Sequence, residues 1–275
     1  MSDNSRVDMP AGGLLRWLWI VVALLVIGLA LSSLFVSKSC VRGGKRSAGA
    51  GRKPLPAFCV RSGLPILRAK LKAGKPVHLA FLGGSITQNA GKNGFVTALP
   101  EWIRANYPGS PVRVTNAGVA GTGSERGAKR VDRDVLANNP DLVFVEFSVN
   151  DGARDSLSDM EQIVRKTLQS NPEAELVFLY TTSDGAFKQT ARGKTPEAIG
   201  KHEQVARHYG IPSVSLGSDL RKQLLSGESN WGDLFTDGCH PTEQGYASYN
   251  RDLIMAFEKI LTGGDRVLRR FPGPM

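Results

Sequence analysis

The stretch FLGGSITQNAG, residues 81–91, starts at the end of an apolar run and passes through two glycines directly into a serine. A tight strand-to-helix turn of this kind is a feature of α/β domains with a parallel sheet. Such turns have two functions in proteins: they display a nucleophilic serine, or their backbone N–H groups bind a phosphate. The rest of the chain must distinguish these two functions.

Outward from this turn, apolar runs rich in β-branched residues alternate with amphipathic stretches. The runs predict five strands, at Val77–Leu82, Val112–Thr115, Asp141–Phe147, Leu176–Thr181 and Pro212–Leu216. The stretches predict helices over about 94–107, 124–138, 158–169 and 197–209, and a last helix over about 242–261. This alternation predicts a three-layer α/β/α domain around a parallel five-stranded sheet, with ligand sites at the carboxyl ends of the strands.

The spacing of the glycines argues against a phosphate loop. A Walker loop requires a glycine, four residues and then Gly-Lys-Ser/Thr, whereas six residues separate Gly84 from Gly91, and Asn93 follows Lys92. The dinucleotide pattern Gly-x-Gly-x-x-Gly also fails, because Gly83 and Gly84 are adjacent. The turn therefore favours a serine nucleophile, which needs a base, a group that orients the base, and donors for an oxyanion.

The chain has four histidines that could act as the base. His78 falls inside the first predicted strand and suits a core position, while His202 and His208 lie six residues apart on a helix and face different directions. His240 stands in FTDGCHPTEQG, three residues after Asp237. An aspartate so close can fix the imidazole tautomer and stabilise the imidazolium. From these residues alone, a helix-capping loop with a surface histidine remains the alternative.

Four segments resemble, in order, the four sequence blocks of the SGNH/GDSL hydrolase family: GGSIT at 83–87, NAGVAGTGS at 116–124, FSVND at 147–151 and DGCHP at 237–241. The resemblance covers about residues 73–262. It implies a flavodoxin-like α/β/α fold and a serine esterase that uses no metal and no organic cofactor. It assigns the nucleophile to Ser85, the base to His240, the orienting carboxylate to Asp237, and the oxyanion hole to the N–H of Ser85, the N–H of Gly121 and the amide of Asn150.

The chain departs from the family pattern at three positions. Gly84 stands where the family commonly has aspartate, Ser148 where it commonly has glycine, and Cys239 lies inside the histidine turn. None of these replaces a residue of the triad or the oxyanion hole. The departures therefore bear on substrate preference more than on catalysis.

Other polar residues near the four segments suit structural roles. Asn116 is expected to hold its own turn, and Asp151 and Asp155 to cap the helix that follows them. The basic stretch at residues 188–194 is expected to be a solvated loop. Its functional alternative is the attraction of an anionic acylated, phosphorylated or uronic glycan.

Residues 14–36 are predicted to be a single-pass membrane anchor. Within them, Trp17–Val36 is 20 residues without a charge, and such a helix spans roughly 30 Å, the thickness of the hydrocarbon core of a bilayer. The anchor divides the chain into an N-terminal tail (1–13), a basic flexible linker (37–64), a catalytic domain (65–263) and a C-terminal tail (264–275).

Two opposing signals bear on the side of the membrane. Six basic residues follow the span, Lys38, Arg42, Lys45, Arg46, Arg52 and Lys53, and by the positive-inside rule they favour a cytoplasmic catalytic domain. The usual outward placement of anchored hydrolases favours the other side. The extracytoplasmic placement is our prediction, and the cytoplasmic side is its alternative.

Charge and cysteine content restrict the partners. The net charge is +10, and no acidic residue occurs between Asp8 and Glu101, which favours anionic lipid or polymer as a partner. The sequence has no zinc-finger spacing and no single-strand aromatic signature, which argues against nucleic acid. Cys40, Cys59 and Cys239 are too few for a disulfide framework and lack metal-site spacing; the first two could form a disulfide or be thiols.

The sequence thus predicts a membrane-anchored serine esterase that acts on acyl esters of a small molecule, a glycan or a lipid. Two alternatives stay open: an O-acyltransferase that uses the same residues, and a non-catalytic glycan-binding module. The sequence carries no signal for the oligomeric state.

Overall fold

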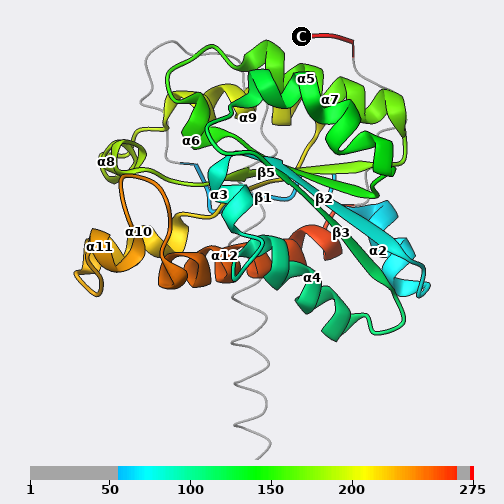
Figure 1. Cartoon of the computed structure of the whole chain (residues 1–275), viewed down its shortest axis with the longest axis horizontal. Coiled ribbons are helices and arrows are strands. Elements are labelled where there is room, and N and C mark those ends of the chain that lie inside the picture. The colour runs from blue at the N-terminus through cyan, green and yellow to red at the C-terminus, as the bar shows by residue number, and fades with distance from the viewer. Residues whose placement is uncertain (1–54, 265–272) are drawn as a thin grey trace, which may run out of the picture. The chain divides into compact units, whose positions relative to one another are not determined.

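The sheet at the centre of the domain (Figure 1) has six strands, and their order is β1-β6-β5-β4-β2-β3. The computed structural model describes residues 55–264 and 273–275, all of which belong to one compact unit. The strands are β1 (Phe58–Cys59), β2 (Val77–Gly83), β3 (Val112–Gly118), β4 (Leu142–Glu146), β5 (Glu175–Tyr180) and β6 (Ser213–Ser215). Strands β2 to β6 run parallel, as predicted, whereas β1 pairs antiparallel with β6.

Helices cover both faces of the sheet (Figure 1). On one face lie α5 (Ser124–Asp134), α7 (Leu157–Ser170) and α9 (Glu197–Tyr209); on the other lie α2 (Pro65–Lys72), α4 (Phe95–Asn106), α10 (Ser218–Ser226) and α12 (Glu243–Thr262). The shorter helices are α3 (Ser85–Asn89), η1 (Leu136–Asn138), α6 (Ser148–Asp151), α8 (Asp184–Ala191) and α11 (Trp231–Leu234). The predicted three-layer α/β/α arrangement is confirmed.

Alternating side chains of β2 enter the two hydrophobic cores. Leu79 and Phe81 belong to the core beneath α4 and α12, and Ala80 and Leu82 belong to the core beneath α5 and α7. Phe81 stacks on Phe144 of β4 with ring centroids 4.6 Å apart. Because both faces are buried, the strand reads as a continuous apolar run in the sequence. This burial fixes the position of the carboxyl end of β2, at the edge of the sheet where the parallel strands end.

Two predictions are wrong at the start of the domain: the sheet has more than five strands, and the linker does not reach residue 64. Phe58–Cys59 form a sixth strand, and Leu64 is fully buried, so the folded domain begins before residue 65. Arg61 also forms a buried salt bridge with Glu203 of α9. A two-residue edge strand carries no periodic signal, which explains why the sequence pattern missed it.

Apart from the helices of three to five residues, three helices were not predicted: α2, α8 and α10. Helix α8 replaces the first part of the expected basic loop, and its Ser183 side chain caps it by accepting from the N–H of Ala186 at 3.3 Å. None of the α8 side chains is fully buried, so the helix leaves no apolar stripe in the sequence. Helices α2 and α10 each bury two side chains, a signal too short to read.

Several predictions fall on residues outside those the structure describes. They are the N-terminal tail, the anchor at 14–36, the linker up to residue 54, most of the C-terminal tail and Cys40. Among the described residues, every helix is too short or too polar to cross a bilayer. The alternatives for Cys40 and Cys59 stay predictions, while Cys239 is a free thiol.

Candidate active site

The strand-to-helix turn after β2 places Ser85 at the first position of α3. Gly84 precedes it in an extended conformation, and a Cβ atom there would collide with the side-chain Oδ1 of Asn150. A Cβ at Gly83 would collide with the hydroxyl of Thr87. Close packing, not a left-handed backbone, therefore requires both glycines. The tight turn leaves the Ser85 hydroxyl partly exposed at the carboxyl edge of the sheet.

Ser85, His240 and Asp237 form a continuous chain of contacts. Ser85 Oγ lies 2.7 Å from His240 Nε2, and His240 Nδ1 lies 2.6 Å from Asp237 Oδ2. The other carboxylate oxygen, Asp237 Oδ1, accepts from the backbone N–H groups of His240 and Cys239, both at 2.8 Å. These donors, the His240 N–H first, hold the pKa of Asp237 well below its usual range. The carboxylate stays ionised and can stabilise a protonated His240.

Local bonds fix the turn that carries Asp237 and His240. The N–H of Thr236 donates to the carbonyl of His240 at 2.9 Å, and Phe235 pairs with Pro241 in a short antiparallel bridge. The indole of Trp231 in α11 donates to the carbonyl of Asp237 at 2.7 Å. The His240 ring is thus held in place before any substrate binds.

Asn150 and Gly121 flank the serine turn. Asn150 lies on α6, and its side chain packs so closely on Gly84 that no larger residue would fit there. Gly121 lies on the β3–α5 loop with φ +67°, a left-handed conformation that favours glycine. In the described part of the chain, neither the Asn150 amide nor the Gly121 N–H makes a hydrogen bond. Both donors remain available to a ligand.

Asn116 and Gln88 tie the β3–α5 loop to α3. The amide of Asn116 donates to the carbonyl of Gln88 at 3.1 Å, and its Oδ1 accepts from the N–H of Gly118 at 3.0 Å. The side chain of Gln88 accepts from the N–H of Ala120 at 2.9 Å. The structural role predicted for Asn116 is confirmed, and its contacts reach the serine helix as well.

A buried carboxyl group, Glu146, lies beneath the serine turn. It accepts from the hydroxyls of Thr87 (3.0 Å) and Thr181 (2.6 Å), and burial raises its pKa. The backbone N–H of Gly84 also bonds to it. Sequence reasoning missed this residue, although an acidic residue at the end of the apolar strand LVFVE was a usable signal.

Asp151 joins the Asn150 helix to the loop that carries Gly121. Its Oδ1 accepts from the N–H of Ser124 at 2.9 Å, and its Oδ2 contacts His202 Nε2 at 2.9 Å. Asp151 therefore caps the preceding helix, α5, and the prediction that it caps the following helix is wrong. The reason is long-range: α5 and α6 meet in space although the segments lie 27 residues apart. Asp155 approaches the N–H of Leu157 at 3.5 Å, at the start of α7.

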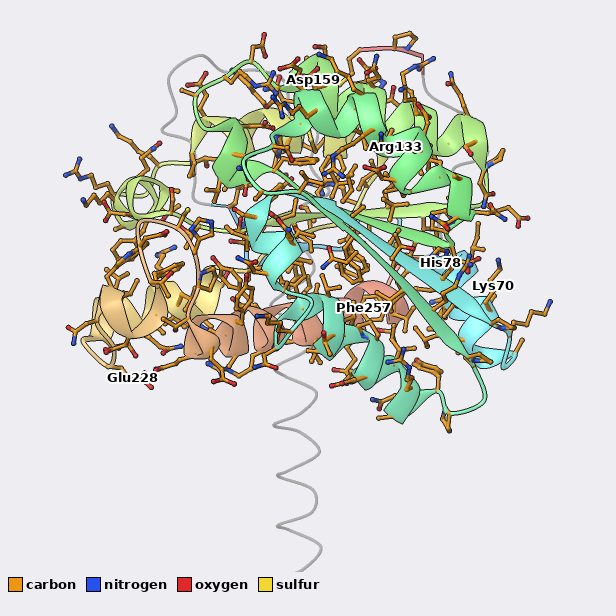
Figure 2. The ribbon with its side chains drawn as sticks, viewed as in Figure 1. Lys70, His78, Arg133, Asp159, Glu228 and Phe257 are labelled. Carbon is orange, nitrogen blue, oxygen red and sulfur yellow. The ribbon has the colours of Figure 1, made fainter. Side chains whose placement is uncertain are left out.

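The other histidines lie away from the serine. His78, at the right in Figure 2, is at the opposite end of β2 from Ser85, and its buried ring contacts Thr115 and the carbonyl of Asn138. As predicted, His202 and His208 face different directions: His202 is buried and His208 is exposed.

One group of side chains in the described residues could hold a metal ion. Donor atoms of Asp237, Cys239 and His240 lie within 4.8 Å of one another. Cys239 Sγ is 3.8 Å from His240 Nδ1, and burial raises the pKa of the thiol. A metal would compete with the proton that His240 shares with Asp237. The arrangement thus suits proton transfer through His240.

The sequence of this domain matches a known family. Residues 81–248 match the profile of the GDSL-like lipase/acylhydrolase family. No curated protein is significantly similar to the chain.

Solved structures with the same fold include two carbohydrate esterases. One is a two-domain esterase active on acetylated mannans, co-crystallised with mannopentaose: it is 27% identical, with a TM-score of 0.70, over 80% of this chain and 59% of that one. This chain therefore spans about three fifths of that esterase. An acetylxylan esterase from Geobacillus stearothermophilus is 20% identical, with a TM-score of 0.54, over 66% of this chain and 94% of that one. The second likeness concerns the fold alone.

Proposed function

The chain belongs to the GDSL-like lipase/acylhydrolase family, and on that premise we propose that it is a serine esterase that removes acetyl groups from carbohydrates. The contact of Ser85 Oγ with His240 Nε2 at 2.7 Å carries the proposal, because a serine becomes nucleophilic when a base accepts its proton. The acetylated-mannan esterase, at 27% identity, supports the substrate class.

The proposed reaction begins with an attack of Ser85 Oγ on the ester carbonyl. His240 Nε2 takes the proton, and the ionised Asp237 stabilises the imidazolium through Nδ1. When the tetrahedral intermediate collapses, the imidazolium returns this proton to the departing sugar oxygen. Water, deprotonated by the same nitrogen, then attacks the acyl-serine, which releases acetate and restores Ser85.

The proposed oxyanion hole consists of the N–H of Ser85, the N–H of Gly121 and the amide of Asn150. The last two make no hydrogen bond among the described residues, and they flank the serine from the β3–α5 loop and from α6. Donors of this kind each stabilise a transition state by about 2.7–4 kcal/mol. In this proposal Glu146 holds the serine turn through Thr87, Asp151 joins α6 to the start of α5, and neither contacts the substrate.

The first experiment is hydrolysis of acetyl, butyryl and octanoyl chromogenic esters by the full-length protein, with Ser85→Ala as the paired control. We expect activity that is highest for acetyl esters and lost in the variant. Equal activity in both proteins would overturn the role of Ser85. Activity that appears only with an added sugar acceptor would instead support the O-acyltransferase. A failure of serine-reactive probes to label the protein would support a non-catalytic glycan-binding module.

We also propose that residues 14–36 anchor the enzyme in a membrane with the catalytic domain on the extracytoplasmic side. The charge-free Trp17–Val36 supports the anchor. A phosphatase reporter fused after Gly263 tests the side, because such a reporter is active only outside the cytoplasm. Reporter activity is the expected result, and its absence with normal protein levels favours the cytoplasmic alternative.

A further inference from the structure

A pocket opens at the carboxyl ends of β5 and β6. Its wall includes Thr182, Thr190, Lys194, Thr195, Ser215 and Arg221. These residues come from the end of β5, from α8 and the segment after it, from β6 and from α10. The pocket thus lies on the edge of the sheet where ligands of parallel α/β domains bind.

The pocket carries two cations and no carboxylate. Neither Lys194 nor Arg221 has a side-chain hydrogen bond or an ion pair within residues 55–264, and no Asp or Glu lines the wall. The nearest acidic residues in the sequence are engaged elsewhere: Asp184 pairs with Lys188, Glu197 with Lys201, and Asp219 with Arg251. The positive charge in the pocket is therefore left uncompensated by the described part of the protein.

Hydroxyl groups complete the polar lining. Those of Thr195 and Ser215 make no hydrogen bond in the described structure, while those of Thr190 and Thr182 bond to nearby carbonyls. A guanidinium, an ammonium and neutral hydroxyl donors suit a carboxylate or phosphate oxygen. A neutral sugar would leave both cations unpaired.

Helix α8 forms a wall between this pocket and the triad. Its Ala186 and Thr190 line the pocket, while the N–H of Asp184 donates to the carbonyl of Gly238 at 2.9 Å, in the turn between Asp237 and His240. Strands β5 and β2 are separated by β4 alone. Two strand spacings amount to roughly 10 Å, so one short oligosaccharide can reach both sites.

We propose that this pocket binds an anionic substituent, a carboxylate or a phosphate, on the acetylated glycan whose ester is cleaved at Ser85. The inference rests on the proposed esterase function and narrows its substrate class from carbohydrates in general to acidic ones. It also assigns different roles to two lysines of the basic stretch at residues 188–194. Lys194 faces the pocket, whereas Lys188 forms an ion pair on the exposed surface of α8.

The test compares the full-length protein with the double variant Lys194→Ala/Arg221→Ala. The substrates are an acetylated uronic-acid oligosaccharide, an acetylated neutral manno-oligosaccharide of the same length, and 4-nitrophenyl acetate. Lys188→Ala is the matched control, because it removes a cation from the same region without touching the pocket. The double variant loses two charge-assisted contacts to the anion, so we expect KM for the acidic substrate to rise at least tenfold. The two neutral esters and the control variant should change less than twofold.

Equal changes for acidic and neutral substrates, or no change for either, would overturn the proposal. Competition by inorganic phosphate and by glucuronate separates the two anion sources: the preferred one inhibits the acidic substrate in the wild type and loses this effect in the double variant. Calorimetric titration of both anions tests the pocket even if no ester is cleaved. If the protein binds anions through Lys194 and Arg221 but hydrolyses no ester, only the esterase function is contradicted. If it hydrolyses esters through Ser85 but shows no such anion binding, only this inference is contradicted.

Discussion

Within the part of the chain that the structure describes, two aspartate–histidine pairs differ mainly in their surroundings. Asp237 and His240 are 2.6 Å apart and 53% and 34% exposed, and the second ring nitrogen contacts Ser85. Asp151 and His202 are 2.9 Å apart and almost completely buried, and they join α6 to α9 and to the start of α5. The same pair of residue types can thus suit proton transfer at an exposed site and join helices at a buried one. Solvent access and the partner of the second nitrogen decide which.

The largest expected effect is on catalysis by the exposed pair. Asp237→Asn keeps the shape of the side chain but removes the charge that stabilises the imidazolium. We expect kcat to fall about 10⁴-fold, the effect typical of this change in a serine triad. The midpoint of urea denaturation should barely change, because the pair is solvent-exposed. A large loss of stability with normal kcat would reverse our assignment of the two pairs.

The buried pair should respond in the opposite way. His202→Ala leaves the Asp151 carboxylate buried without its imidazole partner and opens a cavity beside Phe178. The lost hydrogen bond to a buried carboxylate and the cavity together cost about 3–5 kcal/mol of stability. Urea denaturation measures the loss of stability. The kcat of the protein that remains folded should stay near the wild-type value, which shows that the effect is on stability and not on catalysis. His208→Ala, on the exposed face of the same helix, is the control and should be neutral.

The sequence distinguishes these pairs only in part. Asp237 and His240 lie three residues apart, so a local pattern finds them together. Asp151 and His202 lie 51 residues apart and meet only because α6 packs against α9. Ser85 and Asn150 each follow a predicted strand, so the sequence predicted that both lie at the carboxyl edge of the sheet. The contacts of Glu146 with Thr87 and Thr181 join distant segments and could not be predicted from the sequence. Long-range hydrogen bonds between buried polar groups leave no periodic trace.

Two adjacent residues, Asn150 and Asp151, show the same contrast between an exposed and a buried side chain. Asn150 is exposed and makes no side-chain hydrogen bond in the described structure, while Asp151 next to it is buried and bonded on both oxygens. Asn150→Ala should lower kcat about 10²–10³-fold, with KM and stability nearly unchanged, because the amide is proposed to act on the transition state alone. Steady-state kinetics on an acetyl ester provide the test. A change confined to KM would indicate substrate binding instead of an oxyanion role.

The smallest effect concerns a second buried aspartate, Asp252, which resembles Asp151 but has no imidazole partner among the described residues. Both cap a helix: Asp252 accepts from the N–H of Asp219 at the start of α10, as Asp151 does from Ser124 at the start of α5. Burial by itself would raise the pKa of Asp151, but the hydrogen bonds from His202 and Ser124 outweigh it and lower that pKa. Burial raises the pKa of Asp252 to about 7, against the bond from Asp219.

This difference predicts a pH dependence of stability. Because the pKa of Asp252 is higher in the folded state than in the unfolded one, its contribution is fully present below about pH 4 and is lost as the pH rises through about 7. Between pH 5 and pH 8 the loss amounts to roughly 2.5 kcal/mol. Asp252→Asn keeps an oxygen that accepts from Asp219 but cannot ionise, so urea unfolding at the two pH values should give a difference smaller by about this amount. Asp184→Asn, on the exposed helix α8, should leave the pH dependence unchanged. If Asp252→Asn does the same, then the N–H donors of α10 hold the Asp252 carboxylate in its charged form, and the His202 imidazole beside Asp151 is not what separates these two helix caps.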